Sequence, residues 1–163
     1  MAVQLKIKTN TQFVQKRLRK FQRKFPRIID RELMASGFLL IQIIQNLTKK
    51  GKDFRRRNFR KYSDSYSKFK EKYVGTNVVN LMLSGDMLNS LTPDHKSVKK
   101  TGRNKVTLGF SNSEMRERAF RIQTGDGQPE RRFFGFDKTT EKKISREFEK
   151  QIKKEMKKLG LWV

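Results

Sequence analysis

Positive charge dominates this 163-residue sequence, in which 40 Lys and Arg stand against 16 Asp and Glu, a formal net charge of +24. Repulsion among so many like charges opposes a compact monomer unless counter-charge lies nearby. Residues 1–61 are the most basic part, with 18 Lys and Arg and 3 Asp and Glu. We therefore expect an acidic partner, and composition leaves open whether it is DNA, RNA, an acidic protein surface or an anionic membrane.

The apolar residues are few but large. Hydrophobic residues make up 34% of the chain and charged residues another 34%, close to the composition at which folding alone becomes marginal. The 13 Phe side chains nevertheless provide large apolar groups for a core. Because domains commonly contain about 100–150 residues, we predict a single domain over residues 1–163 that gains part of its order from neighbours.

Hydrophobic periodicity predicts an α+β fold, with a small central antiparallel sheet and amphipathic helices on its N- and C-terminal sides. Alternating apolar residues predict strands at 2–8 and 105–110. Helical spacing predicts a helix from Asn10 or Thr11 that Pro26 interrupts, because a proline disfavours helical geometry in the residue before it. Further helices are predicted at 27–48, shortly after residue 61, at 113–123 and from Thr139 or Thr140 to about 159.

Two of these helices carry a further prediction. Gly37, in the middle of the 27–48 segment, costs up to about 1 kcal/mol relative to Ala, so we expect another element to pack closely there. In the last helix, apolar residues recur at intervals of four, four, four and three, which predicts docking through Ile144, Phe148, Ile152 and Met156.

The residues needed for catalysis or metal binding are scarce. His95 is the only histidine, it lies in a loop beside Asp94, and the sequence has no cysteine, which excludes disulfides, thiolate metal sites and the common zinc sites. No phosphate-binding or dinucleotide-binding glycine motif is present. A magnesium-dependent nuclease remains possible only if carboxylates gather to hold the ion, the candidates being Asp53, Asp64, Asp86, Asp94 and Asp126. Positions at turns or helix caps explain Asp64, Asp86 and Asp126 better. We predict a protein without enzymatic activity, metal or cofactor.

A basic segment with interleaved aromatic residues, GKDFRRRNFRK at 51–61, is the strongest local indication of a binding site. Guanidinium groups suit phosphate and carboxylate, and Phe54 and Phe59 are able either to stack on bases or to pack into the core. We expect contact with a protein or nucleic-acid partner through Arg55, Arg56, Arg57, Arg60 and Lys61. RRFFGFD at 131–137 is only partly similar to the ribonucleoprotein signature of RNA-recognition sheets, because it lacks the leading glycine.

Three segments, in order, resemble motifs of the phage virion-morphogenesis family, which includes tail-completion and neck proteins of tailed bacteriophages. Residues 59–66, followed by Lys70, are similar to the family's aromatic–x–x–Leu/Tyr–Ser–x–x–Tyr pattern. Residues 81–91, LMLSGDMLNSL, resemble its Leu–x–x–Thr/Ser–Gly–x–Leu/Met–x–x–Ser–Leu/Ile stretch. Residues 119–136 resemble an Ala, a Gly-terminated segment and Pro–x–Arg–x–Phe–Leu–Gly. The matching residues are Tyr62, Ser63, Tyr66, Leu83, Ser84, Gly85, Met87, Ser90, Leu91, Gly125, Pro129, Arg131, Phe133, Phe134 and Gly135.

This resemblance implies a structural virion protein that acts at the head–tail junction as a subunit of a closed homo-oligomeric ring. Implied partners are the portal or connector, the tail terminator or other tail proteins, with non-specific contact with phage DNA and no membrane partner. The implied location is the virion, with assembly in the host cytoplasm, and the start of the sequence, MAVQLKIKTN, has no signal-peptide core. The alternative from charge alone is a nucleic-acid-binding module of ribosomal or nucleoid type.

Overall fold

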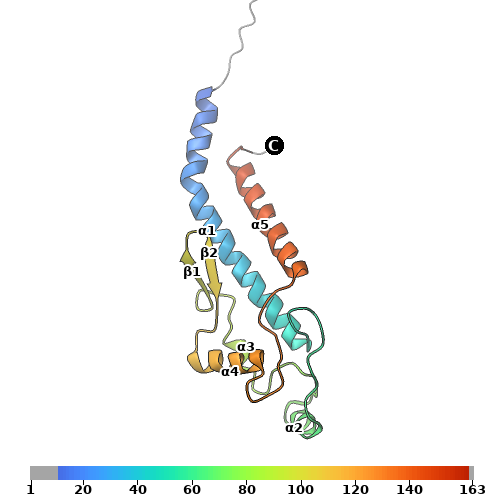
Figure 1. Ribbon diagram of the computed structural model, residues 1–163. Helices are drawn as coiled ribbons and strands as arrows, with labels where there is room; N and C mark the ends of the chain where they lie inside the picture. The colour runs from blue at the N-terminus through green and yellow to red at the C-terminus, as the bar shows by residue number, and fades with distance from the viewer. Residues whose placement is uncertain (1–10, 162–163) are drawn as a thin grey trace, which may run out of the picture.

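The computed structural model describes residues 11–161 and has the predicted α+β architecture, in which helices flank a two-stranded antiparallel sheet (Figure 1). The strand predicted at 2–8 lies outside the described residues. Within the described part of the chain the elements, in order, are α1 (Thr11–Lys49), α2 (Asp64–Val74), α3 (Asp86–Asn89), β1 (Val98–Gly102), β2 (Lys105–Leu108), α4 (Ser113–Thr124) and α5 (Lys138–Lys158).

The predicted break at Pro26 is wrong, because α1 continues through it as one helix of 39 residues. Proline removes one main-chain hydrogen bond from a helix interior and costs about 3 kcal/mol. Contacts with α5 lie on both sides of the proline. Before it, Arg17 donates a hydrogen bond to the Gly160 carbonyl, 3.0 Å away, and after it the guanidinium of Arg31 lies 3.3 Å from the carboxylate of Glu155.

Helix α5 lies alongside α1, so segments from the two ends of the chain run side by side (Figure 1). Its cap is Asp137, whose carboxylate accepts a 2.8 Å hydrogen bond from the Thr140 N–H, and not Thr139 or Thr140 as predicted. The predicted apolar stripe is only half-buried, Phe148 included, because one neighbouring helix covers it without a second layer. Phe148→Ala is therefore expected to lose less hydrophobic stabilisation than the same substitution at a fully buried phenylalanine.

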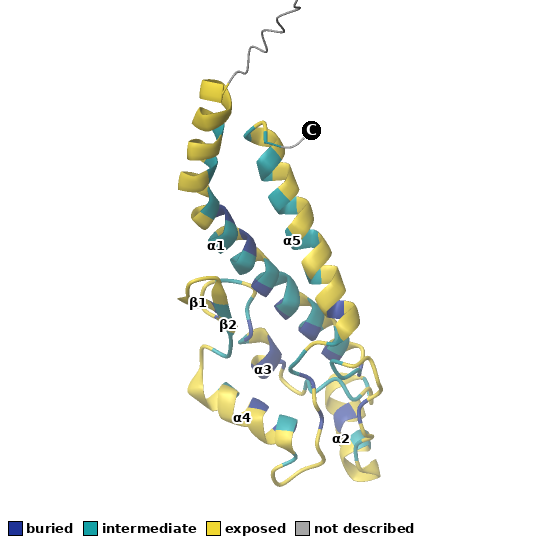
Figure 2. Cartoon of the chain, turned by 45° about the horizontal axis from the view of Figure 1, so that its top comes forward, coloured by how far each residue is buried: buried dark blue, intermediate teal, exposed yellow. Residues whose placement is uncertain are grey.

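The core lies where the C-terminal half of α1 meets α3, α4 and β1 (Figure 2). In the sheet, Val98 pairs with Leu108 and Lys100 with Val106. The strand predicted at 105–110 ends at Leu108, and β1 was not predicted because only its first residue is buried. The buried core residues are Ile41, Ile44, Phe59, Met87, Leu88, Leu91, Val98, Ala119, Ile122 and Phe133.

Gly37 makes the close contact predicted for it. A Cβ atom built at Gly37 would lie 2.5 Å from Cγ1 of Val98, so the backbone of α1 approaches β1 more closely than a side chain at this position would allow. We expect Gly37→Val to lower the free energy of unfolding by about 1–3 kcal/mol through overpacking, measured by urea denaturation. The control is Ala35→Val, at an exposed position two residues earlier, and an equal loss in both variants would contradict this packing argument.

Candidate functional site

A buried cluster of two cationic side chains around Tyr62 joins two of the three motif segments. The guanidinium carbon of Arg131 lies 4.8 Å from the centre of the Tyr62 ring, and Nζ of Lys70 lies 5.1 Å from it. Arg131 is 5% exposed and Lys70 is fully buried. Such cation–π contacts strengthen when water is excluded, and they contribute about 2 kcal/mol or more in that setting.

Arg131 satisfies its donors with main-chain oxygens. Its guanidinium donates to the carbonyls of Arg60 at 3.1 Å, Pro129 at 3.3 Å and Lys61 at 3.3 Å. Burial lowers the pKa of Arg131 from its usual value, although an arginine remains protonated in proteins. Arg131 thus ties the end of the basic segment to the segment that follows α4.

Lys70 fixes the chain between α2 and α3. Its ammonium group donates to the Val78 carbonyl and to Oδ1 of Asn80, the latter at 2.6 Å. Burial lowers the pKa of Lys70 and raises the pKa of the Tyr62 hydroxyl. The residues that resemble the family's Tyr, Lys and Arg positions therefore meet in one place, held by hydrogen bonds to the main chain.

A groove with a volume of about 370 Å³ opens beside this cluster. Motif residues from all three segments form much of its lining, which places the second segment against the other two. Arg118, Ile122 and Gln128 also line the groove and were not singled out in the sequence. The motif residues in its wall are Tyr62, Ser63, Tyr66, Leu83, Pro129 and Arg131.

The remaining motif residues shape the fold around the groove. Gly85 starts α3 with φ +87°, and Met87 and Leu91 are buried in the core. Gly125 ends α4 in the left-handed conformation, with φ +81°. Ser84 is exposed, Ser90 Oγ donates to the Met87 carbonyl at 2.7 Å, and Phe133 is buried.

Gly135 allows a close approach between two segments of the chain. A Cβ atom at Gly135 would lie 3.0 Å from the ring of Phe54, so the glycine accommodates an aromatic residue of the basic segment. The neighbouring Phe134 is fixed by Gln123, whose side chain exchanges hydrogen bonds of 3.0 and 2.9 Å with its backbone. Phe54 and Phe59 thus pack inward and are not free to stack on bases.

A row of aromatic side chains continues from the groove along α2. Successive ring centroids are 4.7, 6.0 and 4.4 Å apart along Tyr62, Tyr66, Phe69 and Tyr73. Phe69 is 43% exposed and Tyr73 is 67% exposed. This aromatic row was not predicted, although its residues recur at intervals of three and four in the sequence, the spacing that places side chains on one face of a helix.

The five predicted contact residues of the basic segment do not form one surface. Arg55, Arg57 and Arg60 line one hollow of about 240 Å³, together with Arg132 and with the carboxylates of Asp53 and Glu130. The four arginines are exposed, and with two carboxylates against them the hollow carries a net positive charge.

The other two cations of the segment do not line the hollow. Arg56 turns to the start of α5, where it donates to Asp137 and to Thr140 at 3.3 Å. Burial acts to raise the pKa of Asp137, but hydrogen bonds from Thr140 and the charge of Arg56 outweigh it and leave that pKa lowered. Lys61 is exposed, and its carbonyl accepts a hydrogen bond from Arg131.

The residues considered for catalysis lie apart. His95 is exposed and its ring meets Phe38 edge-on at 5.6 Å, while Asp94 accepts hydrogen bonds from Thr92 and the Lys96 N–H. Asp64 and Asp86 occupy the first turns of their helices, as predicted. Within residues 11–161, no three His, Asp or Glu side chains gather closely enough to hold a metal ion.

The same described range contains no helix with both the length and the apolar character that a bilayer crossing requires. In comparisons with known proteins, no family model, characterised protein or solved structure matched this chain.

Proposed function

We propose that this chain is a non-enzymatic structural protein of a tailed bacteriophage, acting in neck or tail completion at the head–tail junction as a ring subunit. The observation that carries the proposal is the meeting of Tyr62, Lys70 and Arg131 in one buried cluster. These three residues resemble the family's motif positions, and none of them is arranged for bond-making chemistry. Their contacts build a groove and position an exposed aromatic row, as an assembly subunit requires.

The aromatic row of α2 is the proposed contact between ring subunits. Aromatic residues are enriched in protein interfaces because they bury much apolar area with little loss of rotamer freedom. Phe69 and Tyr73 are exposed in the isolated chain and adjoin the groove through Tyr66. A closed ring uses two different surfaces of each subunit, and the row and groove supply an apolar surface next to a concave one.

Two measurements test the proposal. In purified particles of a phage that carries this gene, quantitative mass spectrometry is expected to find the chain in a fixed copy number. Recovery of the chain with host nucleic acid, and its absence from the particles, would instead support the ribosomal- or nucleoid-type alternative.

At the level of the subunit contact, Phe69→Ser with Tyr73→Ser is expected to dissociate the ring in light-scattering measurements. The control is Phe120→Ser, which removes an aromatic residue that is 62% exposed on α4. Loss of the ring in the control, or its persistence in the double variant, would place the contact elsewhere.

A further inference from the structure

The N-terminal half of α1 carries cations without carboxylates. The sequence has no Asp or Glu before Asp30, whereas residues 11–29 contain seven Lys and Arg. At about 100° per residue, six of the seven fall within an arc of about 140°, opposite the apolar residues of the same helix turns. These six are Lys16, Arg19, Lys20, Arg23, Lys24 and Arg27.

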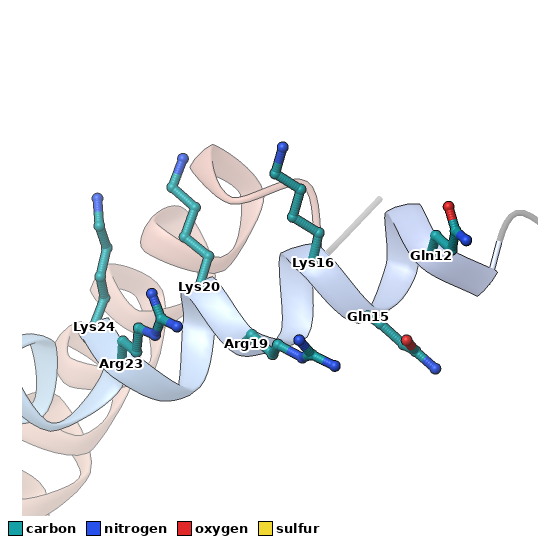
Figure 3. Close-up of a pocket in the computed structure, with 7 residues that line it drawn as sticks. All are labelled: Gln12, Gln15, Lys16, Arg19, Lys20, Arg23 and Lys24. Atoms are coloured by element: carbon teal, nitrogen blue, oxygen red, sulfur yellow. The ribbon is translucent and has the colours of Figure 1, made fainter.

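Three of these lysines form a row. Lys16, Lys20 and Lys24 follow one another at intervals of four residues, and Figure 3 shows their side chains extending from the same side of the helix. Arg19 and Arg23 lie along the adjacent side (Figure 3). A rise of about 1.5 Å per residue spaces the lysines at about 6 Å over a length of about 12 Å.

The end of α5 adds charge to the same surface. A cleft of about 440 Å³ between the two helices is lined by Lys16 and Lys20 from α1 and by Lys157 and Lys158 from α5. Lys158 pairs with Glu155 at 2.7 Å. Among the described residues, no carboxylate lies within ion-pair distance of Lys16, Lys20 or Lys157.

We infer that this surface, which we call the basic tip, binds the phosphate backbone of nucleic acid without sequence preference. The basic tip comprises Lys16, Arg19, Lys20, Arg23 and Lys24 of α1 with Lys157 and Lys158 of α5. A regular row of exposed cations suits a polymer with regularly spaced charges, since each strand of duplex DNA has one phosphate per about 3.4 Å of axis. The inference holds whether or not the chain is a virion protein.

Two other acidic partners fit this surface less well. An interfacial membrane helix buries a long apolar face in the lipid, but here α5 packs against α1 and partly covers Phe21 and Phe25. The apolar side chains left exposed are those of the first two turns, Phe13, Val14 and Leu18. Protein interfaces are depleted in lysine and enriched in aromatic residues at their centre. The row of lysines has no carboxylate within it, and the aromatic residue that lines the same cleft, Phe13, lies beneath the guanidinium of Arg17 at 3.9 Å.

The test compares two triple variants of equal charge in the full chain. Lys16→Ala, Lys20→Ala and Lys24→Ala remove the row, and Lys138→Ala, Lys142→Ala and Lys143→Ala remove three exposed cations from the opposite end of α5. Binding to a fluorescent 20-base-pair DNA duplex of arbitrary sequence is measured by anisotropy at several salt concentrations. Circular dichroism verifies that each variant is folded.

We expect the row variant to lose at least tenfold in affinity at about 0.15 M salt, and the magnitude of the slope of log K against log salt to fall by about 2–3. The control variant should change both quantities much less. Equal losses in the two variants would show that total charge, and not the basic tip, governs binding. Failure of the wild type to bind DNA while it binds vesicles rich in phosphatidylserine would overturn the inference in favour of a membrane.

Discussion

Arg131→Ala is expected to lower the free energy of unfolding by about 3–5 kcal/mol, a loss large enough to unfold a marginally stable domain. The substitution leaves the carbonyls of Arg60, Lys61 and Pro129 without their donor and removes the cation above the Tyr62 ring. Hydrogen bonds to charged groups contribute about 1.5–3 kcal/mol each, and buried acceptors without a partner add a further cost. Urea denaturation followed by circular dichroism measures the change.

The adjacent arginine provides a matched control. Arg132 is exposed and pairs with Glu130 at 2.5 Å, and surface pairs contribute about 0–1 kcal/mol. Arg132→Ala should therefore leave the unfolding curve nearly unchanged. Similar losses from both substitutions would show that this segment responds to any loss of charge and that the three main-chain hydrogen bonds of Arg131 are not decisive.

Simultaneous reversal of Arg55, Arg57 and Arg60 to Glu is expected to abolish head–tail joining, on the proposed virion role. These three cations line a common hollow, so an acidic partner segment would meet them together, and like-charge contacts across an interface cost several kcal/mol. A single substitution should have little effect, since each exposed pair contributes about 1 kcal/mol or less. Arg56 is left unchanged because it holds the start of α5.

Electron microscopy of a phage carrying this triple variant should show filled heads and separate tails. The control reverses Lys99, Arg103 and Lys105 on the exposed β-hairpin, which changes the net charge equally. If the variant of Arg55, Arg57 and Arg60 folds and still gives complete infectious particles, the basic segment is a solvated surface and has no role in joining.

Periodicity predicted the parts of the fold that have strong repeating patterns. The positions of α4, α5 and β2 follow from apolar residues at regular intervals, and the contact at Gly37 follows from a glycine within an otherwise favourable helix. Strand β1 has no such pattern, because four of its five residues are exposed. The continuity of α1 depends on contacts with α5, which a rule about the residue before a proline does not include.

The sequence indicated which residues belong to the basic segment and to the motifs, but it did not indicate which of their side chains contact one another. Nothing in the spacing of Arg55, Arg56 and Arg57 indicates that the middle residue turns toward Asp137 while its neighbours face a hollow. Lys70 and Arg131 are distant in sequence, and both contact Tyr62 only because the chain returns after α4. Contacts of this kind depend on tertiary structure, which local sequence does not specify.

The continuity of α1 has a mechanical consequence for the whole protein. Helix α1 extends as one rigid rod from the core to the basic tip, and the close contact between Gly37 and Val98 of β1 fixes its position in the core. Lys16 lies 21 residues from Gly37, a length of about 32 Å along the helix axis. A tilt of α1 by about 10° about Gly37 would therefore move Lys16 by about 5 Å. Because Arg17 donates a hydrogen bond to the Gly160 carbonyl, such a tilt would carry the end of α5 with it, and a small change in core packing would become a larger displacement at the far end of the molecule.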